Sequence, residues 1–520
     1  MGLSSIDAAA FPADDFGCKR PHVTAVTVMG NVMLLFVRFE PFHILLNRIP
    51  LVSRDDPGMA VLHVVLGDLA FVSDLLLCEK VSRVCFLQEA VTHILFVLQD
   101  GVNGRFKPLW FTACSRNAFF ITFKQIVATE QKFFNYRVNA LFWKDMVTNS
   151  AANLDWLINN GVLFSGVIDN YYGLGKFDAF HWFQDGKGSN FIGPMAAKAE
   201  ELGATFMTDT RGRELIMEGG KVAGILATKG DTVVRINCPV VILASGGYAN
   251  NEKMMKERGY DLTYSFNNGV PGHNGDVLKM AIQAGALDVS RQRGFLREPY
   301  SYGINFFDSM TQSIHRSGPV LWVNQDAERY CNENCGAITP GNNSNAVQTQ
   351  KTSYLILDQG IIDTIVANGT DIQSQVDDAV AANPANNIYK ADTIAELAEK
   401  IGLDPEALTA TVEHYNEMCD KGDDEDFDKP ADKMVALRNA PYYIFRQDLA
   451  FWTSVGGIST NRRMEAINEF GTPIPGLYAV GTDGCELYRE TYTMNVPASC
   501  NANNVNSGRT AARNAAEYIG

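Results

Sequence analysis

The sequence predicts an α/β fold, and two segments show this most clearly. Residues 477–480 are a short apolar run after the turn at Pro475 and Gly476, as expected of a buried strand. Helical spacing resumes after Ser499 and continues to the end of the chain. Upstream, residues 240–244 form a continuous apolar run, which is typical of a strand buried within a sheet. Helical and strand-like segments alternate around both runs, and this alternation predicts the class.

The composition is that of a globular protein with room for two or three domains. The chain has 520 residues, of which 46% are hydrophobic and 20% are charged. Its formal net charge of −15 argues against a nucleic-acid partner and against an anionic membrane surface. The ten cysteines lack the spacing of a metal site, so we expect no bound metal and reduced thiols in the cytoplasm.

Two N-terminal runs are apolar, but neither predicts a membrane span. Residues 23–37 are short for crossing a bilayer. Residues 59–77 carry His63, Asp68 and Asp74, which are costly in hydrocarbon. The sequence also contains no C-x-x-C-H motif, so we expect no haem domain in this chain.

The central part of the chain begins with a helix and leads to a glycine pair. Residues 137–157 have apolar side chains at helical spacing. Residues 215–217 and 222–228 flank two glycines and predict a hairpin. The strand at 240–244 then ends in S-G-G, where two glycines allow a ligand to approach the backbone closely. Asp276 precedes the next helix, either as an N-cap alone or also as a ligand neighbour.

Residues 290–440 predict a separate α+β unit. A strand is expected within residues 317–324 and a short helix at 394–401. Asp404 and Pro405 have the order of an N-cap and a first helical residue. Residues 422–428 are an acidic turn, which on its own is also typical of a solvated surface.

At the C-terminal end, the strand at 477–480 runs into Gly481, Thr482 and Asp483, and a helix begins near Ser499. Free backbone N–H groups and the positive end of a helix dipole suit an anionic or electron-rich cofactor edge. An ordinary strand–loop–helix with a glycine turn explains the same pattern equally well.

The residues at these places resemble a known family. G-L-Y-A-V-G-T-D-G at 476–484 and A-S-C-N-A-N-N-V-N-S-G-R-T-A-A at 498–512 resemble the C-terminal end of the fumarate reductase/succinate dehydrogenase flavoproteins, which contacts FAD. V-V-I-L-A-S-G-G-Y at 240–248 resembles the strand-to-glycine crossing beside FAD in that family. The similarity is strongest to soluble fumarate and urocanate reductases, and it covers residues 132–520.

The resemblance implies a two-dinucleotide-fold FAD-binding domain, built from residues 132–289 and 441–520. An α+β capping domain, residues 290–440, is inserted between the two parts. The implied cofactor is FAD, and the residues that the resemblance places beside it are Ala244, Ser245, Gly246, Gly247, Asn274, Gly275, Asp276, Gly481, Thr482, Asp483, Ser499, Cys500 and Asn501.

Residues 1–131 do not follow the family. A dinucleotide-binding domain opens with a strand, a G-x-G-x-x-G turn and a helix, and no two glycines in this segment are spaced G-x-G. Residues 26–37 could form a strand, but R-F-E-P-F follows instead of a glycine turn. The segment is a degenerate nucleotide domain, a fused unrelated domain or a stretch in the wrong reading frame, and we favour the third. We expect residues 1–130 to be loosely packed against the rest.

The family's substrate-binding cations are mostly replaced. A flavin reductase needs a group that polarises the substrate and a group that donates a proton. Arg316 aligns with a substrate-side arginine of the family, but Ala337 stands where the proton-donor arginine follows an N-E pair. The family's H-H-T-M-G-G is F-W-T-S-V-G-G at 451–457, and the late N-R-L-G-G is N-V-P-A-S at 495–499. Fumarate would therefore lose its cationic clamps.

A small insertion after Gly481 offers replacements. Tyr488 could donate a proton and Arg489 could hold an oxyanion, so we predict Arg316, Tyr488 and Arg489 as the catalytic residues. Aromatic side chains would suit a larger and less charged substrate, and those near the expected site are Tyr300, Tyr302 and Trp452.

These observations predict an FAD-dependent oxidoreductase that reduces an activated C=C bond of a small organic substrate. Its electron donor is unidentified. Two alternatives remain open: an inactive pseudo-flavoprotein or fusion that lacks the FAD pyrophosphate turn, and a binding or membrane-associated module formed by residues 1–130.

Overall fold

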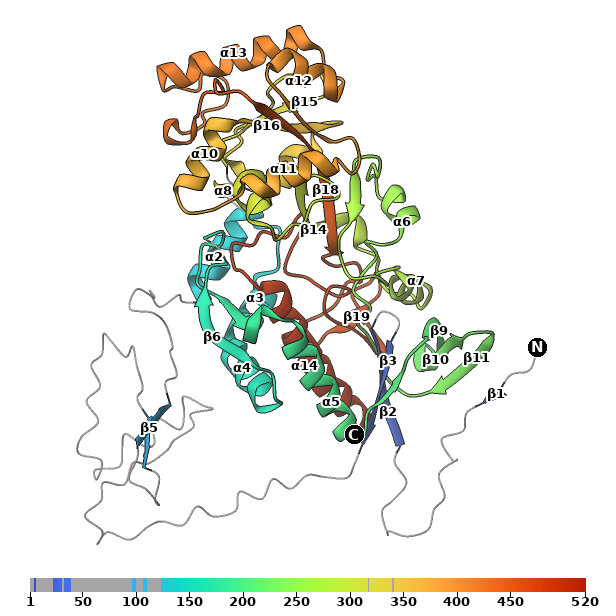
Figure 1. Cartoon of the computed structure of the whole chain (residues 1–520). Helices are drawn as coiled ribbons and strands as arrows, with labels where there is room; N and C mark the ends of the chain where they lie inside the picture. Colours follow the sequence, from blue (N-terminus) through green and yellow to red (C-terminus); the bar gives the residue numbers. More distant parts are fainter. Residues whose placement is uncertain are drawn as a thin grey trace.

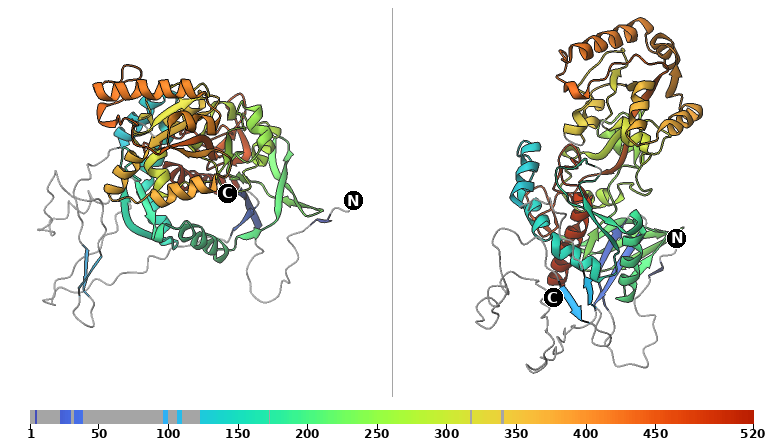
Figure 2. Two further views of the ribbon diagram at one scale, coloured as in Figure 1. Left: turned by 45° about the horizontal axis from the view of Figure 1, so that its top comes forward. Right: turned by 60° about the vertical axis from the view of Figure 1, so that its left-hand side comes forward.

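The structure is a computed structural model that describes residues 123–520, apart from residues 172, 317, 339 and 340. Before residue 123 it describes five strands: β1 (Ser4–Ser5), β2 (His22–Met29), β3 (Val32–Arg38), β4 (Phe96–Gln99) and β5 (Phe106–Leu109). The predicted α/β class is confirmed. A lower unit holds the main sheet and the C-terminal helix, and an upper unit, the cap, holds a second sheet under several helices (Figures 1 and 2).

The main sheet has six strands in the order β19-β20-β12-β2-β3-β8. Its centre is β12 (Val241–Leu243), which runs parallel to β20 (Pro473–Ala479) on one side and to β2 on the other. The remaining strands are each antiparallel to the neighbour nearer the centre: β19 (Glu465–Ile467) to β20, β3 to β2, and β8 (Thr205–Met207) to β3. The two predicted buried strands are therefore neighbours, and they end at the same edge.

Both faces of this sheet are covered, which explains its continuous apolar runs. Val241 and Leu243 share a core with the meander β9 (Thr210–Glu218), β10 (Lys221–Lys229) and β11 (Thr232–Asn237). Ile242 and Tyr478 alternate with them and face the helical side. That side holds α3 (Ala140–Thr148), α4 (Ser150–Asn159) and the C-terminal α14 (Ser499–Ile519) (Figure 1). The predicted hairpin and the predicted C-terminal helix are both present.

The expectation of few contacts from residues 1–130 is wrong for β2, β3 and the helix α2 (Phe123–Phe133), whereas β4 and β5 form a separate two-stranded sheet. β2 pairs with β12, and β3 pairs with β8. Residues 26–37 thus belong to an antiparallel hairpin of two strands, β2 and β3. The hairpin extends the main sheet at the edge of β12 that β20 does not occupy. The helix α2 buries Ile126 and Glu130 against the body. The remainder of residues 1–122 lies outside the described residues.

The cap sheet is organised around one long strand, β18 (Tyr442–Ser454), which runs down from the cap toward the main sheet (Figure 1). The sheet order is β13-β18-β16-β15, and β14 (Phe295–Tyr300) and β17 (Ile388–Ala391) also pair with β18. The other strands are β13 (Ser265–Asn267), β15 (Leu321–Asn324) and β16 (Ser353–Asp358). The strand expected within 317–324 is β15.

The cap helices begin and end where the sequence indicates. They are α10 (Gln359–Ala367), α11 (Gln373–Ala382), α12 (Ile394–Ile401) and α13 (Pro405–Lys421). The predicted helix at 394–401 is α12. Asp404 caps α13 by accepting hydrogen bonds of 2.9 Å from the backbone N–H groups of Glu406 and Ala407, with Pro405 at the first position.

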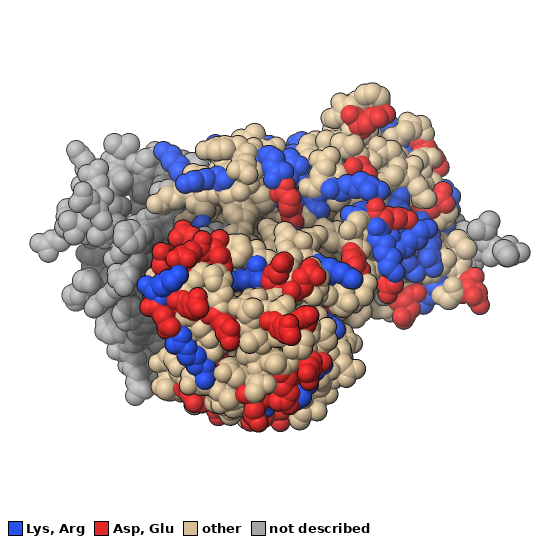
Figure 3. Space-filling model, turned by 90° about the horizontal axis from the view of Figure 1, so that it is seen from above, with Lys and Arg blue, Asp and Glu red and all other residues tan. Residues whose placement is uncertain are grey.

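The top of the cap carries charges of both signs in close mixture (Figure 3). Lysines and glutamates one helical turn apart account for part of it, such as Lys400 and Glu396 at 2.9 Å. In the described part of the chain, no helix combines the length and the apolar character that crossing a bilayer requires.

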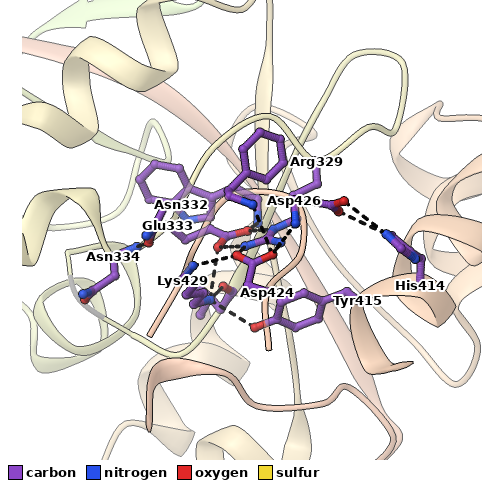
Figure 4. A network of polar contacts seen from close by, with 12 residues as sticks. Arg329, Asn332, Glu333, Asn334, His414, Tyr415, Asp424, Asp426 and Lys429 are labelled. Atoms are coloured by element: carbon purple, nitrogen blue, oxygen red, sulfur yellow. Dashed lines mark hydrogen bonds and ion pairs between the residues drawn. The ribbon is translucent and has the colours of Figure 1, made fainter. Parts of the chain in front are cut away.

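A charge-balanced cluster lies buried inside the cap (Figure 4). Arg329 binds Glu333 at 2.8 Å and Asp424 at 2.5 Å, and these side chains are at most 4% exposed. Lys429 lies 3.2 Å from Glu333 and donates to the Tyr415 hydroxyl at 3.1 Å. The acidic turn at 422–428 is therefore not wholly solvated, because its residue Asp424 is buried and forms an ion pair with Arg329, in the segment that follows β15.

We predict that Asp424→Asn destabilises the protein by about 3–5 kcal/mol, since it leaves buried Arg329 without one of its two carboxylates. Burial alone raises the pKa of Asp424, but the hydrogen bonds from Arg329 and from the Lys429 backbone outweigh it and lower the pKa to about 2. The contribution of ionised Asp424 to the free energy of unfolding is therefore fully present above about pH 4 and is lost as the pH falls through about 2. Urea unfolding at a series of pH values measures it.

The matched control is Asp426→Asn, which removes an exposed partner of His414 at 3.1 Å. Its effect should stay within about 0.5 kcal/mol. Equal urea midpoints for the two variants would contradict a stabilising role of the buried cluster.

Candidate functional site

The two parallel strands β12 and β20 end in loops that are held together by one carboxylate. Gly246 and Gly247 after β12 have positive φ angles of 89° and 88°. Asp483 after β20 accepts hydrogen bonds from both of their N–H groups at 3.0 Å, and also from the backbone N–H and the hydroxyl of Ser245. Burial raises the pKa of Asp483, while these backbone donors oppose the shift. The glycine conformations and the buried Asp483 thus define one rigid loop pair.

A third loop closes over the glycines. Gly275 donates its N–H to the Gly247 carbonyl at 3.0 Å, and Asn250 donates to the His273 carbonyl at 2.9 Å. The His273 ring lies directly against Gly246, and a Cβ on Gly246 would overlap it. Burial lowers the pKa of His273, which favours the neutral imidazole.

Gly246, Asp276 and Asp483 were expected to converge, and their elements do. Gly246 and Asp483 are hydrogen-bonded, and Asp276 directly follows Gly275 at the start of α7 (Asp276–Gln283). The Asp276 carboxylate itself points to the meander and binds Arg211 at 2.5 and 2.7 Å. The backbone of this loop therefore faces the glycines, whereas the side chain of Asp276 joins α7 to β9.

The N-terminus of α14 is fixed next to the same loops. Gly481 donates to the Ser507 hydroxyl at 2.9 Å, and Asn503 donates to the Gly481 carbonyl at 3.2 Å. The helix opens at Ser499 after Ala498 in the left-handed conformation, with φ of 61°. Burial raises the pKa of Cys500 to about 12, so its thiol stays protonated. The predicted residues at Ala244–Gly247, Asn274–Asp276 and Gly481–Asp483 are thus gathered at one edge of the sheet, and α14, which begins with Ser499–Asn501, is held there through Asn503 and Ser507.

The structure corrects the proposed catalytic pair of Tyr488 and Arg489. Tyr488 is fully buried, and its hydroxyl donates to Ser499 at 2.7 Å in a core shared with Trp143. Arg489 lies toward the surface and donates to the Arg137 carbonyl at 2.6 Å. The two side chains therefore make their contacts in different places, one in the core and one toward the surface.

Arg316 remains a candidate, because it lies in a buried polar cluster of the cap, which we call the expected substrate pocket. Its side chain is 5% exposed and donates to Gln312 at 2.7 Å. It lies 3.5 Å from the carboxylate of Glu298 and 3.8 Å from the sulfur of Met494. Its guanidinium group also stacks over Phe306, 5.3 Å from the ring centre.

Glu298 is a pocket residue that the sequence analysis missed. It is 4% exposed on β14 and accepts a hydrogen bond of 2.7 Å from Asn343. Its position two residues before Tyr300 was the available signal, because alternation along a strand puts both on one face.

An aromatic cluster completes the pocket and connects it to the glycine loop. Trp452 packs against Phe306 and Tyr300, with ring centres 4.8 and 6.1 Å apart. The next residue, Thr453, donates its hydroxyl to the Gly246 carbonyl at 2.9 Å. The other members are Phe266, Ile304 and Ala450. The expected aromatic residues Tyr300 and Trp452 are therefore part of the pocket wall, and Tyr302 lies against Phe266 at its rim.

The polar groups around the glycine loop fit a planar cofactor with donors and acceptors on its edge. His273 Nδ1 and Asn250 Oδ1 are buried and have no hydrogen-bond partner among the described residues. Together with the close backbone approach at Gly246 and Gly247, they would suit the isoalloxazine end of FAD. No pyrophosphate-binding turn lies within residues 123–520 as described.

Comparisons with known proteins agree with this arrangement. Residues 137–495 match the protein family described as "FAD binding domain". A vinyl phenol reductase of Lactiplantibacillus plantarum is 30% identical over 419 residues, covering 76% of this chain and 84% of the relative. The cytochrome-type fumarate reductase of Shewanella frigidimarina is 28% identical over 303 residues, covering 57% and 49%. An NADH:acrylate oxidoreductase of Vibrio harveyi is 28% identical over 358 residues, covering 65% and 33%.

The chain thus spans half or less of the length of the last two relatives. Among solved structures, an open flavocytochrome c3 fumarate reductase superposes with a TM-score of 0.58 at 21% identity, over 77% of this chain and 68% of that one. That likeness shows the fold.

We predict that Asp483→Ala lowers both stability and flavin retention. Removing the carboxylate leaves three buried backbone N–H groups without acceptors, at a cost of about 1–3 kcal/mol each. The measurements are the thermal midpoint and the FAD-to-protein ratio after gel filtration. Asp145→Asn is the control, since it removes only the exposed pair with Arg462. Unchanged flavin content in Asp483→Ala would contradict the role of this carboxylate.

Proposed function

This chain belongs to the FAD-binding domain family, and from that premise we propose that it reduces a C=C bond conjugated to an uncharged aromatic ring. The proposed substrates are small vinyl phenols and similar molecules. The sequence-based predictions of FAD as cofactor and of an oxidoreductase acting on CH–CH groups are confirmed by the family match and the relatives. When bound, FAD supplies the hydride.

The residues proposed to hold FAD belong to the loops already described. Gly246 and Gly247 would allow the flavin ring to approach the backbone closely, and His273 would pack on its edge. The first N–H groups of α14, after Ala498, would face the electron-rich pyrimidine end of the flavin.

The observation that carries the substrate class is the aromatic wall around Trp452. Trp452 belongs to the F-W pair that stands where the resembling family has two histidines, and it packs in a cluster with Tyr300 and Phe306. The cation that remains, Arg316, already has the carboxylate of Glu298 at 3.5 Å. A dicarboxylate would therefore meet little uncompensated positive charge, whereas an aromatic ring would bury its apolar surface.

Arg316 has a defined part in this proposal. Hydride addition to a conjugated C=C bond builds negative charge on the rest of the conjugated system. A guanidinium group held by Gln312 and Glu298 would stabilise that charge without reorienting, because its side chain is already fixed. This chain covers 84% of the length of the relative that is named as a vinyl phenol reductase. That name supports the same class of substrate.

A second candidate function is supported by a separate observation. No two glycines of residues 1–131 are spaced G-x-G, so the chain could be a pseudo-flavoprotein that does not retain FAD. The visible absorbance of the purified protein, with and without added FAD, separates this alternative from the first.

We predict that the FAD-loaded protein reduces 4-vinylphenol with a kcat/KM at least about 100-fold above that for fumarate, equivalent to about 3 kcal/mol of transition-state discrimination. A reduced viologen dye serves as an artificial donor, because the physiological donor is unidentified, and chromatography identifies 4-ethylphenol. Trp452→Ala should lower the kcat/KM for 4-vinylphenol by at least about tenfold.

Phe470→Ala is the matched aromatic control, since Phe470 is 82% exposed and remote from the pocket residues in sequence. Faster turnover of fumarate than of 4-vinylphenol by the loaded protein would overturn the proposal.

A further inference from the structure

Glu130 is a buried carboxyl group that neither the family match nor the proposed mechanism uses. It lies on α2, before the matched residues 137–495, and it is 0% exposed. Its carboxyl oxygens accept hydrogen bonds from the Thr493 hydroxyl at 3.1 and 3.4 Å. A carboxyl group that is buried so completely and is held by neutral donors, the Thr493 hydroxyl and the Asn495 side chain, is expensive to keep, which points to a role.

Thr493 belongs to a short loop that borders the pocket. The following residue, Met494, places its sulfur 3.8 Å from the guanidinium group of Arg316. Asn495 donates its N–H to the Thr493 hydroxyl at 3.4 Å and accepts a hydrogen bond of 2.9 Å from the Lys176 N–H. The loop at 493–495 therefore joins Glu130 on one side to Arg316 on the other.

We propose that Glu130 is a positioning residue of the substrate pocket, which through Thr493 holds the loop at 493–495 against Arg316. This inference rests on the proposed function, because it concerns the same pocket. Glu130 acts through Thr493 and Met494 and does not itself touch a substrate in this arrangement. The helix α2 is thereby a working part of the enzyme, although it precedes the matched region.

The two protonation states of Glu130 offer the loop different bonds. The ionised carboxylate only accepts, as in the observed bond from Thr493, which leaves the Thr493 oxygen free for the Asn495 N–H. The protonated form can also donate and would compete for that oxygen or for the Asn495 side chain. The bonds seen here are ones that the ionised group can make without such competition.

Burial raises the pKa of Glu130 to about 7, and the opposing influences come from Asn495, Thr493 and the facing Lys176. The other titratable group that faces it is the Tyr492 phenol, whose pKa burial raises and which Glu130 raises further. The loop thus changes its bonds near neutral pH. Because the folded-state pKa lies above the ordinary value of 4.5, the contribution of Glu130 to stability is largest below about pH 4.5 and falls as the pH rises from about 4.5 to 7.

The test compares the full-length protein with Glu130→Gln, which keeps the size and one acceptor but cannot titrate. Thermal unfolding from pH 4.5 to 8.5, without substrate, should show a falling midpoint in the wild type and no such fall in Glu130→Gln. With 4-vinylphenol, the wild-type kcat/KM should rise through pH 7, mainly through KM, and the variant should lose this rise.

Thr493→Val is the second variant. Loss of the Thr493 donor raises the pKa of Glu130 further, so both pH transitions should move to higher pH. An unchanged stability profile in Glu130→Gln would overturn the inference whatever the substrate. If the stability profile changes but no alkene is reduced at any pH, the proposed function fails while the titration of Glu130 stands. If kcat/KM keeps its rise through pH 7 in Glu130→Gln, the positioning role is wrong.

Discussion

The carboxylate of Asp483 is the interaction on which the rest of the site depends. It accepts hydrogen bonds from three successive residues after β12, and it comes from the loop after β20. Two glycines with positive φ can present their N–H groups to one carboxylate in this way, whereas residues with a Cβ would be strained there. This arrangement fixes the edge of the sheet at which His273, Gly481 and the start of α14 gather.

The strand β18 carries this fixed edge into the cap. Its last residues bind the glycine loop, with Ser454 accepting from the Tyr248 N–H at 3.3 Å and Thr453 donating to Gly246. The same end of the strand, residues 448–454, pairs with β14, which bears Glu298 and Tyr300. The distance between the flavin site and the pocket wall is thus set by continuous backbone. The aromatic character of that wall follows from Trp452, which is part of the same strand.

Patterns along single segments were sufficient to predict much of this. The buried runs at 240–244 and 477–480, the glycines after them and Asp404 before α13 carry their structural meaning locally. Patterns along single segments could not predict the partner of Glu130, which is Thr493, or that of Glu298, which is Arg316, because the partners lie outside the segment of each glutamate. Tyr488 and Arg489 were misjudged because composition shows which groups could react but not on which side of the chain each one lies.

The most direct test of the account is the reoxidation of reduced flavin in a single turnover. The FAD-loaded protein is photoreduced without oxygen and mixed with 4-vinylphenol or with fumarate, and the return of the oxidised flavin band is followed by stopped flow. The account predicts rapid, stoichiometric reoxidation by 4-vinylphenol and little by fumarate. Failure to bind FAD, or reoxidation by fumarate alone, would contradict it.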